Sequence, residues 1–380
     1  MLEATAAELL PSDHAQAILV GRLLLDAGPT PVVVRDGSVF DVSRAAATVS
    51  DLLEVDPASL RGEAICATEA LGTRDGPRLL APVDLQVIKA CGVTFALSAI
   101  ERVIEERARG DSARAAEVRG DLEAKVGSGI RSVVPGSDEA MRLKAALIDA
   151  GMWSQYLEVA IGPDAEVFTK APVLSTVGWG ADIGIRSDSD WNNPEPEVVL
   201  VADSAGKPRG AMLGNDVNLR DFEGRSALLL GKAKDNNAST ALGPFIRIFD
   251  QNFSMDDVRS AVVNLEIEGP EGYRLTGTNR MSEISRDPEE LIRQTLSEHQ
   301  YPDGFALFLG TLFAPVQDRD HPGRGFTHKE GDVVRISTPK LGSLVNRVTT
   351  SKAAAPWEYG IRDLMRNLAE RGLLAQPAFA

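Results

Sequence analysis

The sequence predicts an α+β fold in which β-strands dominate. From residue 156 onward, short apolar runs are separated by Gly, Pro and Asp turns, which is typical of strands. Residues 18–42 show the same alternation, and Asp36-Gly37 between two apolar runs is a strong hairpin signal. The strands do not alternate with helices, so the βαβ repeat of a doubly wound sheet is not expected.

A chain of 380 residues is long enough for two domains. We expect a small β-rich domain over residues 1–80, with a short helix at 48–53, and a larger domain over 81–380. The larger domain opens with an apolar run at 85–95, typical of a buried strand. A helical insert follows at about 100–151, where opposite charges four residues apart, as in Arg102 and Glu106, support a helix. We predict no chemistry for residues 111–151 of this insert.

Beyond the insert, apolar runs between turns predict strands at 157–161, 167–168, 197–202, 211–213, 262–267, 306–309, 332–336 and 344–348. Two helices are expected in the same region. The first spans 287–298, with Asp287 as N-cap and Pro288 at the first helical position. The second is an amphipathic helix over 358–369.

Composition restricts the class of protein. The net charge is −15 and the basic residues are dispersed among acids, which argues against nucleic acid or an anionic membrane as a partner. Cys66 and Cys91 have neither metal-ligand spacing nor the numbers for a disulfide framework. No apolar run approaches the ~18 residues of a membrane span, and the acidic start does not resemble a signal peptide. We therefore expect a cytoplasmic protein.

Three acidic residues predict a metal site. Glu195 and Glu197 lie two residues apart at the start of the apolar run 198–202, so a strand places both side chains on one face. A return strand after the turn at 203–206 brings Asp216 beside them. Carboxylates that enter a core need a cation between them. Oxygen ligands suit Mg²⁺, with Mn²⁺ or Ca²⁺ as alternatives. The competing interpretation is a solvated strand edge.

Such a metal can activate a 2-oxo acid by polarising its keto group, which acidifies the neighbouring carbon. Lys234 is a candidate base, because a lysine near a dication has a lowered pKa; the alternative is a solvated loop lysine. Arg220 and Asp221 follow Asp216 and are expected to orient the ligands rather than react. The four histidines lack an orienting constellation, and we do not expect them to catalyse.

These motifs resemble the fumarylacetoacetate hydrolase superfamily. The resemblance rests on Glu195-Pro196-Glu197, on Asn215-Asp216-Val217-Asn218-Leu219-Arg220-Asp221, and on Lys234 followed by Leu242-Gly243-Pro244, with further matches at Gly310-Thr311, Gly331-Asp332 and 341–348. Together they span residues 81–350. The resemblance implies a mixed β-roll or sheet catalytic domain with a small N-terminal domain, assembled as a homodimer or a higher homo-oligomer.

One departure from the family pattern reduces the set of reactions that we expect. The carbon–carbon hydrolases and decarboxylases of the family carry Gly-x-Asn-Tyr-x-x-His-x-x-Glu, and that histidine activates water. In the corresponding segment 92–101, Ser98 replaces the histidine while Glu101 remains. A serine does not accept a proton near neutral pH. The chain as a whole, including Trp191-Asn192-Asn193-Pro194 and residues 232–239, most resembles the sugar-acid dehydratases of the superfamily.

This resemblance implies a metal-dependent lyase of oxidative pentose breakdown. Its substrate would be a small-molecule 2-keto-3-deoxy-pentonate of the D-xylonate or D-arabinonate type, and its products 2-oxoglutarate semialdehyde and water. Lys234 or Glu101 would remove a proton from C3, Glu101 would serve as the acid for the leaving hydroxyl, and Ser98 and Thr311 would contact the substrate. The alternatives are a family hydrolase or decarboxylase acting on acylpyruvates or oxaloacetate, and an inactive ligand-binding homologue.

Overall fold

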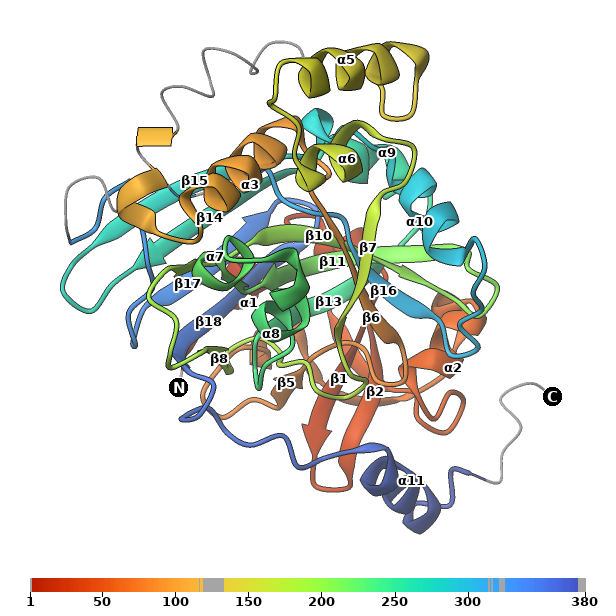
Figure 1. Cartoon of the computed structure of the whole chain (residues 1–380). Coiled ribbons are helices and arrows are strands. Elements are labelled where there is room, and N and C mark those ends of the chain that lie inside the picture. The colour runs from red at the N-terminus through yellow and green to blue at the C-terminus, as the bar shows by residue number, and fades with distance from the viewer. Residues whose placement is uncertain are drawn as a thin grey trace.

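The computed structural model describes residues 2–115, 117–118, 133–313, 315, 317–320 and 325–374, and it is built around a large central sheet (Figure 1). That sheet has 11 strands in the order β4-β3-β2-β1-β13-β11-β10-β16-β6-β7, with β5 paired to β1. Its strands are β1 (Leu19–Leu25), β2 (Gly28–Arg35), β3 (Ser38–Asp41), β4 (Glu63–Ala67), β5 (Arg78–Leu80), β6 (Val87–Gly92), β7 (Glu166–Ala171), β10 (Pro196–Ala202), β11 (Pro208–Asp216), β13 (Thr240–Ile248) and β16 (Phe305–Phe308).

A second sheet of five strands packs on one face of the first. Its order is β15-β14-β17-β18-β8, and its strands are β8 (Asp182–Ile185), β14 (Val262–Glu268), β15 (Arg274–Arg280), β17 (Val333–Thr338) and β18 (Gly342–Thr350). A short ribbon of β9 (Asn192–Asn193) and β12 (Asn218–Leu219) extends the hairpin of β10 and β11.

The helices are short and lie around the sheets: α1 (Ala6–Leu9), α2 (Val49–Glu54), α3 (Ala96–Ala108), α5 (Asp138–Asp149), α6 (Gln155–Ile161), α7 (Arg220–Glu223), α8 (Leu230–Lys234), α9 (Met255–Arg259), α10 (Pro288–Leu296) and α11 (Ile361–Glu370). In Figure 1, α3, α5 and α6 gather at the opposite end of the molecule from α11. Among the described residues, no helix combines the length and the apolar character that a bilayer crossing requires.

Two apolar layers enclose strand β10, whose residues are all buried. Val198 and Leu200 pack in the core shared with the second sheet, whereas Val199 and Val201 pack in a separate core on the opposite face. Because alternate residues of a strand point to opposite faces, this arrangement accounts for the continuous apolar run at 198–202. The segment that carries the acidic residues is therefore fixed from both sides.

Most predicted elements are confirmed. The Asp36-Gly37 hairpin joins β2 to β3, and α10 has Asp287 as N-cap with Pro288 at its start. The strand predicted at 157–161 is wrong, because these residues belong to α6. Ser154 caps that helix by accepting a hydrogen bond from the Tyr156 amide. A short apolar run fits a buried helix as well as a strand.

The strands of residues 1–80 continue the central sheet, since β1 pairs with β13 as well as with β2. The boundary at residue 80 stays a prediction. Of the predicted helical insert, α3 and α5 are present, whereas residues 119–132 lie outside the described part of the chain.

Candidate metal centre and active site

The three predicted metal ligands come together on the hairpin of β10 and β11. The two strands are antiparallel, with Pro196 opposite Asn215 and Glu197 opposite Gly214. This register brings one carboxylate oxygen from each of Glu195, Glu197 and Asp216 to within 4.8 Å of one another, and all three residues are buried. The predicted return strand is thus confirmed, and the solvated-edge interpretation does not describe these side chains.

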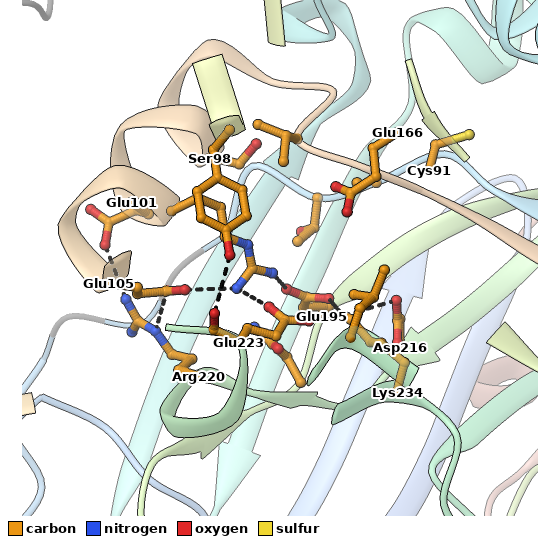
Figure 2. A pocket seen from close by; sticks show the side chains of 18 of the residues that line it. Cys91, Ser98, Glu101, Glu105, Glu166, Glu195, Asp216, Arg220, Glu223 and Lys234 are labelled. Atoms are coloured by element: carbon orange, nitrogen blue, oxygen red, sulfur yellow. Dashed lines mark hydrogen bonds and ion pairs between the residues drawn. The ribbon is translucent and has the colours of Figure 1, made fainter. Parts of the chain in front are cut away.

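A buried lysine lies among these acids. Lys234, at the end of α8, places its Nζ 2.7 Å from Glu195 Oε2, 3.1 Å from Asp216 Oδ2 and 3.4 Å from Glu223 Oε1. Figure 2 shows Lys234, Glu195 and Asp216 pointing toward one another. On the other side of Asp216, Lys170 Nζ lies 2.9 Å from Oδ1. The alternative of a solvated loop lysine does not fit Lys234.

Arg102 reaches the same acids from helix α3. Its guanidinium lies 2.9 Å from Glu195 Oε1 and 2.8 Å from Glu105 Oε2, and it also pairs with Glu223. The structure differs here from the expected surface pair of Arg102 with Glu106, whose carboxylate accepts hydrogen bonds from Ser154 and Gln155 instead. Helix α3 therefore contributes Arg102 and Glu105 to the site in addition to the predicted Glu101.

Four other predicted site residues line the cavity, where each has partners of its own. Glu101 pairs with Arg220 at 3.1 Å, and Arg220 Nε lies 2.6 Å from Glu105 Oε1. Ser98 lines the cavity, but its hydroxyl donates to the Phe95 carbonyl at 2.8 Å. Thr311 lines the cavity as well.

Asp221 does not belong to the residues that line the cavity. Its carboxylate accepts hydrogen bonds from the Ser189 hydroxyl at 2.8 Å and the Asp190 amide at 3.0 Å. It therefore holds the loop that leads into β9 and has no contact with the three acids.

The charges in the site shift one another's pKa values. Burial, followed by repulsion from Asp216 and Glu195, raises the pKa of Glu197. Burial also acts to raise the pKa of Asp216, but Lys170 and Lys234 outweigh it and the pKa is lowered. For Lys234, burial acts to lower the pKa, yet the surrounding carboxylates raise it. The direction predicted for Lys234 beside a dication is not the one these contacts produce.

The donor set fits a divalent cation. Carboxylate oxygens are hard ligands, which Mg²⁺, Mn²⁺ and Ca²⁺ prefer, whereas zinc takes histidine and cysteine. Burial is the largest cause of the raised pKa of Glu197, and repulsion from Asp216 and Glu195 adds to it; a cation between the three acids relieves such repulsion. Glu195, Glu197 and Asp216 would be its ligands.

Comparison with known proteins agrees with this site. Residues 162–349 match the family model described as fumarylacetoacetate (FAA) hydrolase C-terminal. These residues form a fumarylacetoacetate hydrolase family domain. That domain contains all three acids and Lys234.

Two curated relatives are similar to part of the chain. The 2-dehydro-3-deoxy-D-arabinonate dehydratase of Saccharolobus solfataricus is 32% identical over 183 residues, which are 48% of this chain and 58% of the relative. A probable 2-keto-3-deoxyxylonate dehydratase of Haloferax volcanii is 31% identical over 202 residues, 53% of this chain and 66% of the relative. The matched region thus spans less than two thirds of either relative.

Solved structures share the fold over most of the chain. The apo form of 2-keto-3-deoxy-D-arabinonate dehydratase gives a TM-score of 0.64 at 20% identity, covering 87% of this chain and 99% of that one. The same enzyme complexed with magnesium and 2,5-dioxopentanoate gives a TM-score of 0.62 at 20% identity, with the same coverage. The predicted family fold is confirmed.

Several charged residues around the hydrolase-family acids were not predicted from sequence. They are Arg102, Glu105, Glu166, Lys170 and Glu223. Three of them had a local signal. Glu166 and Lys170 flank the predicted strand at 167–168 at alternate positions, which places them on one face, and Glu223 lies three residues after Arg220 in a recognised motif. Arg102 and Glu105 had none, because their helix carries charges on more than one face.

Proposed function

We propose that the protein is a lyase that dehydrates a 2-keto-3-deoxy-pentonate to 2-oxoglutarate semialdehyde, with Mg²⁺ as its cofactor. The observation that carries the proposal is the cluster of three buried carboxylates with Lys234 among them. The names of the two curated relatives support this substrate class. The 2,5-dioxopentanoate in a related structure is the same compound as 2-oxoglutarate semialdehyde.

Bound by Glu195, Glu197 and Asp216, Mg²⁺ would polarise the keto group of a 2-oxo acid and acidify the protons on C3. Lys234 is the candidate for removing one of those protons. Its Nζ faces two of the three carboxylates directly. Positive charge added beside these carboxylates weakens their hold on the Lys234 proton, so the neutral amine becomes accessible.

The acid that protonates the leaving hydroxyl has two candidates. Glu101 lines the cavity, and its carboxylate is already paired with Arg220 at 3.1 Å. Glu166 lines the same cavity, and its pKa is raised by burial, with Glu195 and Asp216 adding to the shift against Arg102 and Lys234. A raised pKa favours the protonated form, which is the form that can donate, and this supports Glu166 as the acid.

The hydrolase or decarboxylase alternative lacks a base where the family has one. The Ser98 hydroxyl donates to the Phe95 carbonyl at the start of α3. It neither accepts a proton near neutral pH nor contacts a carboxylate in the described structure. Ser98 therefore does not supply the base that would activate water at this position. Elimination of the substrate's own hydroxyl group requires no activated water.

The test is incubation of the protein with 2-keto-3-deoxy-pentonate and Mg²⁺, coupled to a semialdehyde dehydrogenase and followed as NAD(P)H. We expect turnover that chelation abolishes. Lys234→Ala and Glu166→Gln should each lose on the order of 10²–10⁴ in rate while Mg²⁺ still binds, and Glu101→Gln should lose less than Glu166→Gln. Release of pyruvate in place of the semialdehyde would refute the dehydratase assignment.

A further inference from the structure

Two asparagines in the cavity have amide oxygens without hydrogen-bond donors. Asn193 and Asn218 line the same cavity as the acids, and each is only 2% exposed. Among the described residues, neither Asn193 Oδ1 nor Asn218 Oδ1 has a hydrogen-bond partner. Leaving such a buried acceptor unpaired is costly, so a donor is expected there when the site is in use.

Two neighbouring asparagines, Asn192 on β9 and Asn215 on β11, have amide oxygens that accept hydrogen bonds from backbone amides. Asn192 Oδ1 accepts a hydrogen bond from the His328 amide at 3.2 Å, and Asn215 Oδ1 accepts one from the Glu195 amide at 3.1 Å. The Asn193 side chain donates through Nδ2 to the Pro194 carbonyl at 2.9 Å, which fixes the orientation of its amide. The oxygens of Asn193 and Asn218 are thus the two in this ribbon that the backbone does not use.

The strands place these two asparagines together and in line with the metal ligands. Asn193 pairs directly with Asn218 across the β9–β12 ribbon, and such opposite side chains have Cβ atoms about 5 Å apart. Asn193 lies two residues before Glu195, and Asn218 two residues after Asp216, so alternation puts amides and acids on one face. The step from acids to amides is about 6.8 Å along the strands.

We propose that Asn193 and Asn218 form a subsite that accepts hydrogen bonds from the hydroxyl groups on C4 and C5 of the substrate. This inference rests on the proposed function. An extended five-carbon acid spans roughly 5 Å from C1 to C5, because its four bonds of about 1.5 Å follow a zigzag path. With its keto acid end at the carboxylate cluster, its other end reaches the amides.

The numbers of donors and acceptors also match. A 2-keto-3-deoxy-pentonate has two O–H donors beyond its keto acid end, and the ribbon offers two unpaired oxygens. An acylpyruvate lacks both hydroxyls, so it would leave both oxygens buried without a donor. A site built to bind hydroxyl groups rejects analogues without them for this reason. The pair would therefore make the site selective for sugar acids.

Binding of two unreactive probes tests this subsite independently of turnover. Both 2,4,5-trihydroxypentanoate and 2-hydroxypentanoate lack the keto group, so neither can be dehydrated by this route. Titration calorimetry with the Mg²⁺-loaded protein should show that the trihydroxy acid binds about 10–100-fold more tightly, as two hydrogen bonds predict. In the double variant Asn193→Ala/Asn218→Ala, the ratio of the two probe affinities should fall below about threefold. The affinity for Mg²⁺ should change by less than about threefold.

The matched control is Asn346→Ala, which removes a buried asparagine whose Nδ2 donates to the Gly178 and Ala181 carbonyls, outside the cavity. It should lower the melting temperature and keep the wild-type ratio. A ratio near one in the wild type, or an unchanged ratio in the double variant, would overturn the subsite. A parallel loss of Mg²⁺ affinity would also overturn it, because the amides would then serve the cation. Absence of turnover with an intact ratio would refute the proposed function alone.

Discussion

Replacing Lys234 by methionine should destabilise the metal-free protein and strengthen its stabilisation by Mg²⁺. The ammonium contacts three buried carboxylates, at 2.7, 3.1 and 3.4 Å. Methionine fills a similar volume without charge, so the variant removes the cation and leaves the acids in place. The negative charges of those acids then repel one another with less positive charge nearby to offset them.

The magnitude follows from the burial of the partners. Removing one partner of a buried ion pair costs about 3–5 kcal/mol, because it leaves an uncompensated charge. Unfolding entropy near 2.1 cal/mol/K per residue gives roughly 0.8 kcal/mol/K for a chain of 380 residues. The melting temperature of the metal-free variant should therefore fall by about 4–6 °C.

Mg²⁺ should stabilise the Lys234→Met variant more than it stabilises the wild type. In the wild type the ammonium and the dication compete for the same carboxylates, whereas in Lys234→Met the dication has them alone. A ligand stabilises the folded state by an amount that grows with its affinity. We therefore expect Mg²⁺ to raise the melting temperature of Lys234→Met by more than it raises that of the wild type.

The assay is thermal unfolding in chelator and in a Mg²⁺ series, with Lys232→Met as the control. Lys232 lies on the same short helix and is exposed, so its loss should change stability by less than about 0.5 kcal/mol. If Lys234→Met melted at the wild-type temperature in chelator, or if Mg²⁺ stabilised the wild type more, the ion-pair account of Lys234 would be refuted.

Three further predictions test the site and its support. Asp216→Asn should weaken Mg²⁺ binding on the order of 10²-fold by calorimetry, whereas Asp221→Asn, outside the cavity, should not. Burial raises the pKa of Glu223 from 4.5 to about 7, so the folded state holds this proton more tightly than the unfolded chain. The resulting stability, roughly 3 kcal/mol, is present below pH 4.5 and lost as pH rises through 7; Glu223→Gln should flatten that slope in urea titrations of metal-free protein. Gly214→Ala would press a methyl group into the Phe308 ring and should cost about 1–3 kcal/mol.

The carboxylate cluster was predictable because it is nearly local. Glu195 and Glu197 share a face through the two-residue period of a strand, and one hairpin adds Asp216. The same reasoning gave the central strands and the β2–β3 hairpin. Short apolar runs carry less information, and α6 was therefore mistaken for a strand.

The cations around the cluster were less predictable because they come from distant elements. Arg102 contacts Glu195 across 93 positions of sequence, and its helical spacing equally suggested a surface pair with Glu106. The geometry decides between these partners, since Arg102 lies inside the cavity with Glu105. The sequence offered Lys234 as a candidate base with a solvated loop lysine as the alternative, and the family motif then supported the first interpretation.

This division between local acids and distant cations has a consequence for how the site works. The segment from β9 to β12 supplies carboxylate and amide oxygens, and the hairpin of β10 and β11 within it holds them in register. The positive groups that face it, Lys170, Lys234 and Arg102, come from β7, α8 and α3. A substitution in the segment from β9 to β12 changes the carboxylate and amide oxygens themselves, whereas a substitution in α3 or α8 changes the positive charge that faces them. In the proposed function, cation binding and proton transfer therefore depend on separate segments of the chain, so variants can separate the two steps.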